Sequence, residues 1–339
     1  MRAVVLEADR SLRMDDRPDP SPGRGEVLVD LATSGICGTD LSIYSGKIAV
    51  RHPRVLGHEM FGHVASSDGG AAAGTRVVID PVLSCGVCYW CSKGQTNLCP
   101  NGALLGRDRD GGFAERIAVP QSNVYEVPAS ISDEVAPLVQ VLTVCVHAQR
   151  DAPVFPGDSV LVLGLGVSGL LHLQIARARG AAPLIGVTRS ASKRELAESL
   201  GADLTFDPGD SHLGERVAEA TGGRGPDVVI ESAGRVETLA AAIGLVRPGG
   251  HIVLFGTITE DRGALPFYSL YLKELTITNP RAAKPEDFPA AIDLAGSGRV
   301  RLAPLISDTF PLEETGAAIE ATAESGTLKI ILDHGGVRS

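Results

Sequence analysis

The chain has 339 residues, of which 44% are hydrophobic and 21% charged, and its formal net charge is −10. This length and composition suit a globular protein of two domains and argue against a disordered or fibrous chain. The acidic balance provides no overall basic surface for nucleic acid or anionic lipid, so we expect small-molecule partners.

The first residues and the apolar runs indicate a cytoplasmic protein. The segment from Met1 to Asp16 alternates like a strand and lacks the apolar core and cleavage site of a signal peptide. No later apolar run reaches the length of a membrane span without a charge, a glycine or a proline. In the reducing cytoplasm, clustered cysteines favour metal or redox chemistry over structural disulfides.

The chain up to about Val127 has the pattern of a β-rich domain. Short runs of β-favouring residues are separated by Gly, Pro and Asp turns. We expect strands over 3–8, 26–35, 75–80, 114–120 and 123–128.

Metal ligands are offered by two segments of this region, GICGTDL and VLGHEMFGH. Cys37 provides a thiol, His58 an imidazole and Glu59 a carboxylate. These are the donor types of a catalytic zinc that keeps one coordination position open for substrate. Taken alone, the two segments are more typical of a buried cysteine and a core histidine. The motifs that follow favour the zinc interpretation.

Four of the six cysteines lie within fifteen residues, in the stretch SCGVCYWCSKGQTNLCP. They are Cys85, Cys88, Cys91 and Cys99. Short spacings of this kind let thiolates converge tetrahedrally on one ion, and four thiolates leave no position for substrate. We therefore predict a structural zinc in a lobe over about 84–100. Disulfides are the alternative, and we expect the lone Trp90 only to pack.

From residue 135 onward the pattern changes to alternating helices and strands, which is typical of a parallel sheet wrapped by helices. The helices are expected over 135–148, 168–179, 192–200, 213–221 and 236–246. The strands are expected over 160–166, 183–188, 204–207, 227–233 and 250–256.

The last pieces indicate that the chain returns to its first domain. They are a strand over 275–279, a helix over 285–297 and a terminal strand over 328–333. Residues 273–279 fit either domain. The predicted organisation is a catalytic domain over 1–150, a cofactor domain over 151–277 and a return to the catalytic domain over 278–339.

A glycine-rich loop joins the first strand of the cofactor domain to its first helix. Its first glycine permits a turn, the second lets a pyrophosphate approach the backbone, and the third lets helix and strand pack closely. The helix N-terminus supplies amide donors for the phosphates. We predict a dinucleotide-binding loop formed by Gly164, Leu165, Gly166, Val167, Ser168 and Gly169.

The end of the next strand selects the cofactor. NAD-binding chains usually end this strand in Asp or Glu, which binds the ribose hydroxyls. Here Thr188 takes that place and Arg189 follows. Without an acid to repel a 2′-phosphate, Arg189 and Ser190 can bind it, with help from Lys193 or Arg194. The alternative is a solvated basic start of a helix. NADP(H) is favoured over NAD(H).

Taken in order, these motifs resemble those of zinc-dependent medium-chain alcohol dehydrogenases, and the likeness runs nearly end to end. It rests on GICGTD, GHE, the four-cysteine lobe, LGLGVSG, IESAG and the closing LKIIL. The resemblance implies an α/β protein with a GroES-like β-rich catalytic domain, a Rossmann cofactor domain and an active site in the cleft between them. It also implies two zinc ions per chain, one catalytic and one structural.

The resemblance also implies roles for single residues of the first zinc site. Cys37 and His58 match the first two zinc ligands, and Glu59 matches the neighbouring carboxylate that binds zinc in part of the family. Thr39 matches the hydroxyl that passes the substrate proton toward solvent. Asp40 matches the acid that orients the ligand histidine and fixes its tautomer.

The third zinc ligand is where the chain departs from the family. Gln140 stands where alcohol dehydrogenases carry Cys and polyol dehydrogenases carry Glu, and an amide oxygen is a poorer zinc donor. Either Gln140 ligates weakly while Glu59 completes the shell, or Cys145 comes in instead. The first is preferred, because five helical residues turn Cys145 away from the direction of Gln140.

The substrate is indicated by a few polar residues. Tyr44 resembles the pocket tyrosine of sorbitol- and threonine-dehydrogenase-like members, and polar groups favour a polyhydroxylated secondary alcohol, or its ketone or aldehyde. Residues 107–109 are candidates for the pocket wall, and Arg281 for the nicotinamide side. Each can equally be an ordinary surface or packing residue.

Two other functions stay open at this point. One is a catalytically silent NADP(H)-binding zinc protein that senses redox state, and the other is a zinc-independent reductase of the same superfamily. Both predict one zinc per chain, whereas the dehydrogenase predicts two. The resemblance further implies a homodimer or homotetramer that assembles through the edge of the Rossmann sheet.

Overall fold

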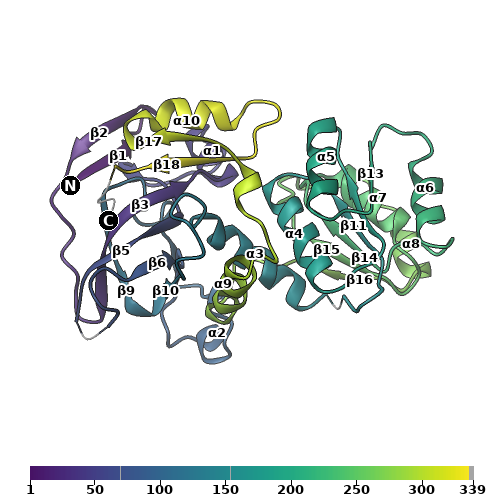
Figure 1. Ribbon diagram of the computed structural model, residues 1–339, viewed down its shortest axis with the longest axis horizontal. Coiled ribbons are helices and arrows are strands. Elements are labelled where there is room, and N and C mark those ends of the chain that lie inside the picture. The colour runs from purple at the N-terminus through teal and green to yellow at the C-terminus, as the bar shows by residue number, and fades with distance from the viewer. Residues whose placement is uncertain (69, 153, 336–339) are drawn as a thin grey trace. The chain divides into compact units, whose positions relative to one another are not determined.

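The computed structural model describes residues 1–68, 70–152 and 154–335. The chain divides into two compact units (Figure 1). The first comprises Met1–Thr143, Ala283–Ser297 and the chain from Leu302 onward, and the second comprises Val144–Ala282 and Gly298–Arg301. Within the described residues, no helix has the length and apolar character needed to cross a membrane.

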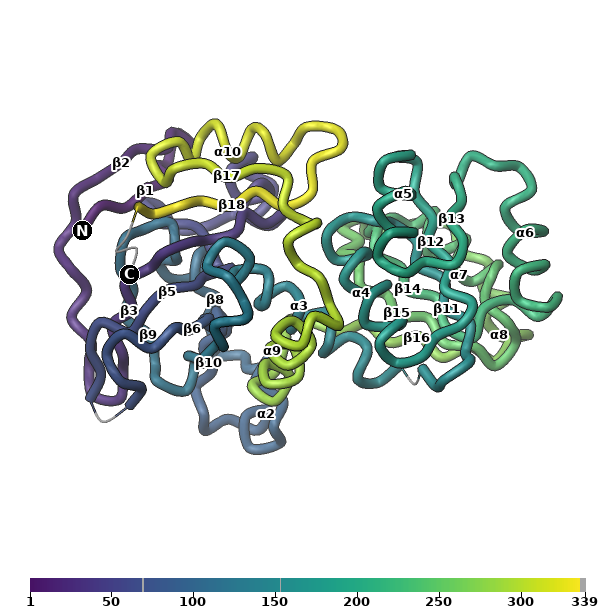
Figure 2. Tube along the Cα trace, viewed as in Figure 1, coloured from purple at the N-terminus to yellow at the C-terminus, as the bar shows by residue number. Residues whose placement is uncertain are grey.

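The first unit is built on a seven-stranded sheet that joins distant parts of the chain. Its order is β10-β6-β5-β3-β18-β17, and β9 also pairs with β3. In Figure 2 the yellow β18 lies beside the purple β3, with which it pairs antiparallel. The strands are β3 (Glu26–Gly35), β5 (Glu59–Ser67), β6 (Arg76–Ile79), β9 (Arg116–Pro120), β10 (Val124–Glu126), β17 (Ile306–Pro311) and β18 (Lys329–Asp333).

The alternation along β3 explains how this sheet builds a core. Every second residue from Val27 to Leu31 is buried, and these side chains pack with Met60 and Val77 of the neighbouring strands. Because successive side chains of a strand point to opposite faces, one apolar face is enough to fix the register. The paired ends of β3 and β5 are therefore held in fixed positions.

Two smaller sheets and several helices belong to the same unit. The sheets are β1 (Arg2–Leu6) with β2 (Leu12–Asp16) and β4 (Arg54–Val55), and β7 (Val82–Leu83) with β8 (Ala103–Leu104). The helices are α1 (Gly38–Tyr44), α2 (Tyr89–Ser92), α9 (Phe288–Gly296) and α10 (Thr315–Thr322). Helix α3 (Leu138–Arg150) begins in the first unit and ends in the second.

The second unit contains a six-stranded sheet in which all paired strands are parallel, in the order β13-β12-β11-β14-β15-β16. Its central strands are buried along their whole length, as expected where helices cover both faces. The strands are β11 (Val160–Leu163), β12 (Leu184–Val187), β13 (Leu204–Phe206), β14 (Val228–Glu231), β15 (His251–Leu254) and β16 (Thr276–Thr278). The helices are α4 (Val167–Ala178), α5 (Ala191–Ser199), α6 (Leu213–Ala220), α7 (Val236–Leu245) and α8 (Phe267–Leu272).

The end of the chain differs in detail from the sequence prediction. Strand β16 pairs with β15, so the ambiguous residues around 276–278 belong to the parallel sheet. The second unit runs from Val144 to Ala282, so the boundaries expected after residues 150 and 277 lie instead after 143 and 282. Residues 298–301, also expected in the first domain, belong to the second unit, where the Gln174 side chain hydrogen bonds to both the N–H and the C=O of Arg301. Helices α1, α2, α8 and α10 and strands β4, β5, β7, β8 and β17 are present without having been predicted.

Candidate active site and metal centres

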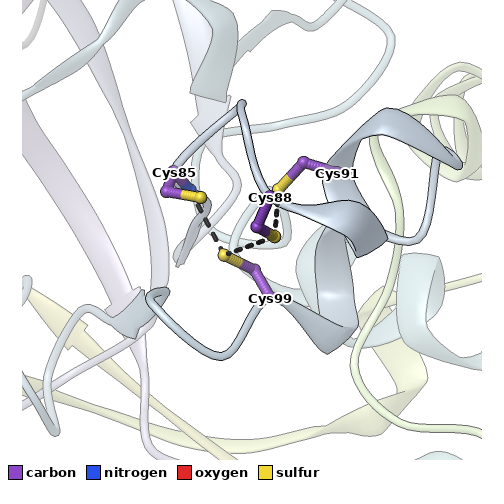
Figure 3. A group of neighbouring side chains, drawn as sticks. All are labelled: Cys85, Cys88, Cys91 and Cys99. Carbon is purple, nitrogen blue, oxygen red and sulfur yellow. Dashed lines mark hydrogen bonds between the residues drawn. The ribbon is translucent and has the colours of Figure 1, made fainter.

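The four cysteines of the lobe converge in the structure. Their sulfur atoms all lie within 4.8 Å of one another, and Figure 3 shows them turned toward a common centre. Cys88 Sγ is 3.5 Å from Cys91 Sγ and 3.7 Å from Cys99 Sγ. A disulfide requires about 2 Å, whereas four thiolates at about 2.3 Å from one zinc ion stand about 3.8 Å apart. The spacing fits a tetrahedral zinc site.

Backbone hydrogen bonds in the lobe favour the thiolate form of its cysteines. The amide of Cys85 donates to Cys99 Sγ at 3.4 Å, and Cys88 is the N-cap of the short helix α2. Hydrogen bonds from the amides of Val87 and Cys88, followed by the contact with Cys99, lower the pKa of Cys85 to about 6. A thiol with this pKa is mostly thiolate at neutral pH, which is the form that binds metal.

Cys37 and His58 are brought together by two paired strands. Strand β3 ends two residues before Cys37, strand β5 begins directly after His58, and the register pairs Gly35 with Glu59. The donor atoms of Cys37, His58 and Glu59 all lie within 4.8 Å of one another. Antiparallel pairing therefore assembles the thiol, imidazole and carboxylate that the sequence analysis selected.

Asp40 fixes both ligand segments. It is fully buried in α1, and Oδ2 accepts a hydrogen bond from the Cys37 amide at 2.9 Å. Oδ1 accepts the Gly57 amide at 3.2 Å and lies 3.5 Å from His58 Nδ1. With Nδ1 facing a carboxylate, Nε2 is left to bind a metal. Thr39 Oγ1 lies 3.8 Å from Cys37 Sγ, so a hydroxyl stands next to the first ligand.

The charges around His58 favour a bound cation. Burial by itself lowers the pKa of His58, but the negative charges of Asp40 and Cys37 outweigh it and raise that pKa well above its usual value. The same negative potential stabilises any cation held there. A thiolate, an oriented imidazole and a nearby carboxylate fit a zinc ion in their donor chemistry.

Sequence reasoning missed Lys329, which completes this region. Its Nζ lies 2.6 Å and 2.5 Å from the two carboxylate oxygens of Glu59 and donates to the Ile36 carbonyl at 2.9 Å. Burial lowers the pKa of Lys329, but Glu59 outweighs this effect and the pKa is raised overall. A lysine inside the buried run LKIILD was the available signal, because buried lysines are nearly always paired. The charge of Glu59 is therefore already balanced.

The backbone before His58 is enclosed too tightly for side chains. Gly57 has a φ of +91°, and a Cβ there would lie 2.4 Å from the Phe113 ring. A Cβ on Gly111 would lie 2.1 Å from the Gly57 carbonyl oxygen, and the Gly112 amide donates to that oxygen at 2.9 Å. The loop over 105–113 therefore clamps the segment that carries the histidine.

The other predicted pocket residues make ordinary surface or packing contacts. Arg107 is paired with Asp108, whereas the exposed Arg109 side chain has no hydrogen bond or ion pair with the residues that the structure describes. Tyr44, at the end of α1, packs against the apolar cluster of the first unit. Arg281 is an exposed residue of the second unit.

The two candidates for the third zinc ligand differ in their contacts. Gln140 belongs to the first unit, as do Cys37 and His58; its side chain is 8% exposed and makes no hydrogen bond within the described ranges. Cys145 belongs to the second unit and is fully buried, and its Sγ donates to the Ser168 carbonyl at 3.8 Å. Burial raises the pKa of Cys145, which disfavours a thiolate. These contacts favour Gln140 over Cys145.

The glycine-rich loop has the geometry that its spacing predicts. Gly164 has a φ of +92°, and a Cβ on Gly169 would lie 1.9 Å from the Gly164 carbonyl oxygen. Gly166 is the N-cap of α4, and a Cβ there would meet no described atom within 4 Å. Leu165 is buried, while Val167 and Ser168 form the first turn of α4. The loop leaves the helix N-terminus open to a phosphate.

The basic residues that follow β12 differ in their contacts. Arg194 Nη1 donates to the carbonyls of Thr188 and Arg189, at 2.7 and 3.0 Å, and pairs with Asp207, so it holds the loop itself. Ser190 caps α5 by accepting the Lys193 amide at 3.4 Å. Burial lowers the pKa of Lys193. The exposed Arg189 guanidinium has no hydrogen bond or ion pair with a described residue, so it is available to a ligand.

Comparisons with known proteins cover both units. A family model described as "Alcohol dehydrogenase GroES-like domain" matches residues 23–129, and one described as "Zinc-binding dehydrogenase" matches residues 168–297. Sorbitol dehydrogenase from Halalkalibacterium halodurans is 30% identical over 324 residues, 94% of each chain. The matches confirm the predicted α/β fold with a GroES-like and a Rossmann domain.

Solved structures with bound cofactor are similar as well. A zinc-binding dehydrogenase from Sinorhizobium meliloti bound to NADP has a TM-score of 0.93 at 33% identity, covering 98% of each chain. An Escherichia coli alcohol dehydrogenase complexed with NADH has a TM-score of 0.91 at 32% identity, covering 98% of this chain and 99% of that one. Both nicotinamide cofactors thus occur among proteins similar to this chain.

Proposed function

This chain belongs to the zinc-dependent alcohol dehydrogenase family, and on that premise we propose that it transfers a hydride between a polyol or other secondary alcohol and NADP(H). The observation that carries the proposal is the cluster of half-buried Cys37 with buried His58 and Glu59, in which Asp40 orients the histidine. The similarity to a sorbitol dehydrogenase supports a polyhydroxylated substrate.

The proposed metal ligands are Cys37, His58 and the amide oxygen of Gln140, with Glu59 beside them. Zinc bound there supplies a Lewis acid that polarises the oxygen of the alcohol or carbonyl. Because Lys329 neutralises Glu59, this set would offer a bound metal one thiolate, from Cys37, and no free carboxylate. A cluster of this low charge holds its metal less firmly than a set with a second thiolate or a free carboxylate.

The proposed proton path begins at Thr39. Its hydroxyl stands 3.8 Å from Cys37 Sγ, on the first turn of α1, where it can take the proton that the alcohol gives up and pass it outward. Asp40 keeps His58 in the tautomer whose Nε2 would be free to bind a metal. The side chains of α1 thus serve both the ligand and the proton.

Metal analysis tests the proposed function directly. We expect two zinc ions per chain in the native protein, whereas one per chain would contradict the proposal and favour a silent or zinc-independent protein. The substitution Gln140→Glu places a charged donor at the third position. It should lower the zinc dissociation constant at this site, measured against a competing chelator, by about tenfold or more. An unchanged constant would remove Gln140 from the ligand set.

The preference for NADP(H) is proposed from the free guanidinium of Arg189 and the absence of an acid at Thr188. Arg189→Ala should weaken NADPH binding about tenfold or more, and NADH binding less than twofold, because only NADPH carries the 2′-phosphate. Arg224→Ala, at another exposed arginine of the second unit, is the matched control. Equal losses for the two cofactors at Arg189 would refute the assignment.

We also propose that the chain forms a homodimer or homotetramer through the edge of the parallel sheet. Strand β16 is an edge strand, and exposed apolar side chains lie on it and on the preceding helix α8, among them Tyr268, Tyr271 and Ile277. An edge strand can pair with its own copy, and the apolar residues would then be covered. Light scattering should give a dimer or tetramer, and Tyr271→Asp should weaken it. A monomeric native protein would contradict this.

A further inference from the structure

The strand order of the second unit fixes where the two halves of a cofactor lie. The order reverses between β11 and β14, and ligands of such sheets bind at the carboxyl ends of the strands beside this point. Thr188, at the end of β12, marks the adenosine side. The nicotinamide half therefore extends toward the ends of β14 and β15. Glu231 is the last residue of β14.

Glu231 holds the loop that follows β14. Its side chain is fully buried, and Oε1 accepts hydrogen bonds from the amides of Ala233 and Gly234, both at 2.9 Å. The same oxygen accepts the hydroxyl of Thr238 at 2.6 Å. Three donors on one oxygen are the arrangement that stabilises an ionised carboxylate, which only accepts hydrogen bonds.

The second carboxylate oxygen of Glu231 has no bonding partner within the described residues. Oε2 is buried without a hydrogen-bond partner, and Glu231 forms no ion pair there. A Cβ on Gly256 would lie 2.6 Å from Oε2, so the backbone after β15 closes tightly around it. A buried charge without a partner is unfavourable, and a nearby cation relieves that cost. Glu59, by contrast, has Lys329.

The loop held by Glu231 touches the dinucleotide loop. A Cβ on Gly164 would lie 2.9 Å from the amide nitrogen of Ala233. A Cβ on Gly256 would lie 2.2 Å from the amide nitrogen of Gly234. The three loops that follow β11, β14 and β15 are thus packed against one another, and the unpaired carboxylate lies among them. This is the edge of the sheet where the nicotinamide half is expected.

We propose that Glu231 is a positioning residue whose negative charge favours the oxidised cofactor over the reduced one. The oxidised nicotinamide ring is a cation and the reduced ring is neutral, so a fixed carboxylate stabilises the first selectively. This inference rests on the proposed use of a nicotinamide cofactor. It concerns the ratio of the two binding constants, which a purely structural role of Glu231 leaves unchanged.

The test measures the dissociation constants of NADP⁺ and NADPH for the native protein and for Glu231→Gln, by calorimetry and by nucleotide fluorescence. Neutralising the charge should raise the constant for NADP⁺ relative to that for NADPH by about tenfold, the order of effect that one unit charge has on another inside a protein. If this variant does not fold, Glu231→Met provides a neutral side chain of similar length.

Thr238→Val is the matched control, because it removes one hydrogen bond on Oε1 and keeps the charge. It should change both constants by the same factor. A ratio within twofold of the native value in the neutral variant would overturn the inference, as would an equal change of the ratio in Thr238→Val. If the native protein binds neither nucleotide, the proposed function fails. If it binds both and the ratio does not change in Glu231→Gln, only the inference about Glu231 fails.

Discussion

The two candidate metal centres of the first unit are built in opposite ways. The lobe takes all four thiols from one short stretch of chain, and backbone amides donate to two of them, Cys85 and Cys99. The site of Cys37 and His58 draws on the ends of two strands, on α1 and on the distant β18. One centre is local and made of like ligands, while the other depends on the whole sheet and on buried charges around its ligands.

This difference in construction suits one centre to stabilising the fold and the other to binding substrate. Four thiolates fill a tetrahedral shell, so the lobe can hold an ion but cannot offer it to a substrate. The second site has mixed donors, and its supporting groups, Asp40 and Lys329, orient or neutralise ligands without adding a thiolate. Substitutions should therefore affect activity at one centre and folding at the other.

The largest expected effect is the loss of activity in Cys37→Ser. Removing a ligand of the catalytic metal should reduce kcat/KM by about a thousandfold or more, because polarisation of the substrate oxygen acts in the transition state. Metal content should fall from two ions per chain to one. Steady-state kinetics and metal analysis measure the two changes.

Cys99→Ser is the counterpart in the lobe. It should also remove one metal ion, but the kcat/KM of the protein that stays folded should remain within about twofold, while thermal inactivation becomes faster. If Cys99→Ser lost as much activity per folded molecule as Cys37→Ser, the division between the two centres would be wrong.

The next largest effect is expected on stability, from Lys329→Met. This change leaves the buried carboxylate of Glu59 without its cation, and breaking a buried pair in this way costs about 3–5 kcal/mol of unfolding free energy. The double variant Glu59→Gln with Lys329→Met should recover most of the loss, because neither position then carries a buried charge. Urea unfolding of the three proteins measures this. A loss below about 1 kcal/mol in the single variant would show that Glu59 finds another partner.

The contrast between the centres also explains what the sequence could reveal. The lobe was predictable because its four ligands are close together in sequence and of one rare type. The ligands Cys37 and His58 needed the support of a family resemblance, since each alone is typical of a core residue. The pairing of Glu59 with Lys329 depends on β18 lying beside β3, and no local pattern reports a contact across 270 residues.

The fold shows the same division. Apart from α8, the helices and strands of the second unit were predicted to within a few residues, since long apolar runs alternate there with amphipathic segments. Helix α1 has only seven residues, begins with glycine and is fixed by the hydrogen bond between Asp40 and the Cys37 amide. That bond is a local capping interaction, in which the third residue of the helix accepts the amide of the N-cap residue. A helix of seven residues is too short for periodicity to predict.

A smaller effect is expected from Asp40→Asn. The amide keeps the shape but cannot stabilise His58 as a carboxylate does, and losing such a supporting group typically lowers metal affinity by about 10- to 100-fold. Competition with a chelating dye measures the affinity of this site, and the lobe ion serves as the internal reference. Equal release of both ions would mean that Asp40 supports the fold in general and not the histidine.

The smallest effect concerns Asp80, a buried carboxyl that lies just before the lobe in the sequence. Its Oδ1 accepts the Val82 amide at 2.9 Å, and within the described residues it forms no ion pair. Burial raises the pKa of Asp80 to about 7, and the nearby Asp287 adds to the shift while the Val82 hydrogen bond opposes it. Glu59 has a lysine in the same sheet; Asp80 does not, so its stability contribution should depend on pH.

The sign follows from proton linkage. Between about pH 4 and pH 7 the folded chain retains a proton on Asp80 that the unfolded chain has lost, so this group makes stability fall as pH rises, by up to about 1.4 kcal/mol per pH unit. Below pH 4 both states are protonated, and above pH 7 the slope ends. Asp80→Asn keeps a neutral side chain throughout. Its unfolding free energy relative to the native protein should therefore increase by about 2 kcal/mol between pH 5 and pH 7, measured by urea unfolding at each pH. Parallel profiles for the two proteins would show that Asp80 is ionised in the folded chain and that the lobe, like the Cys37 site, stabilises its buried carboxylate.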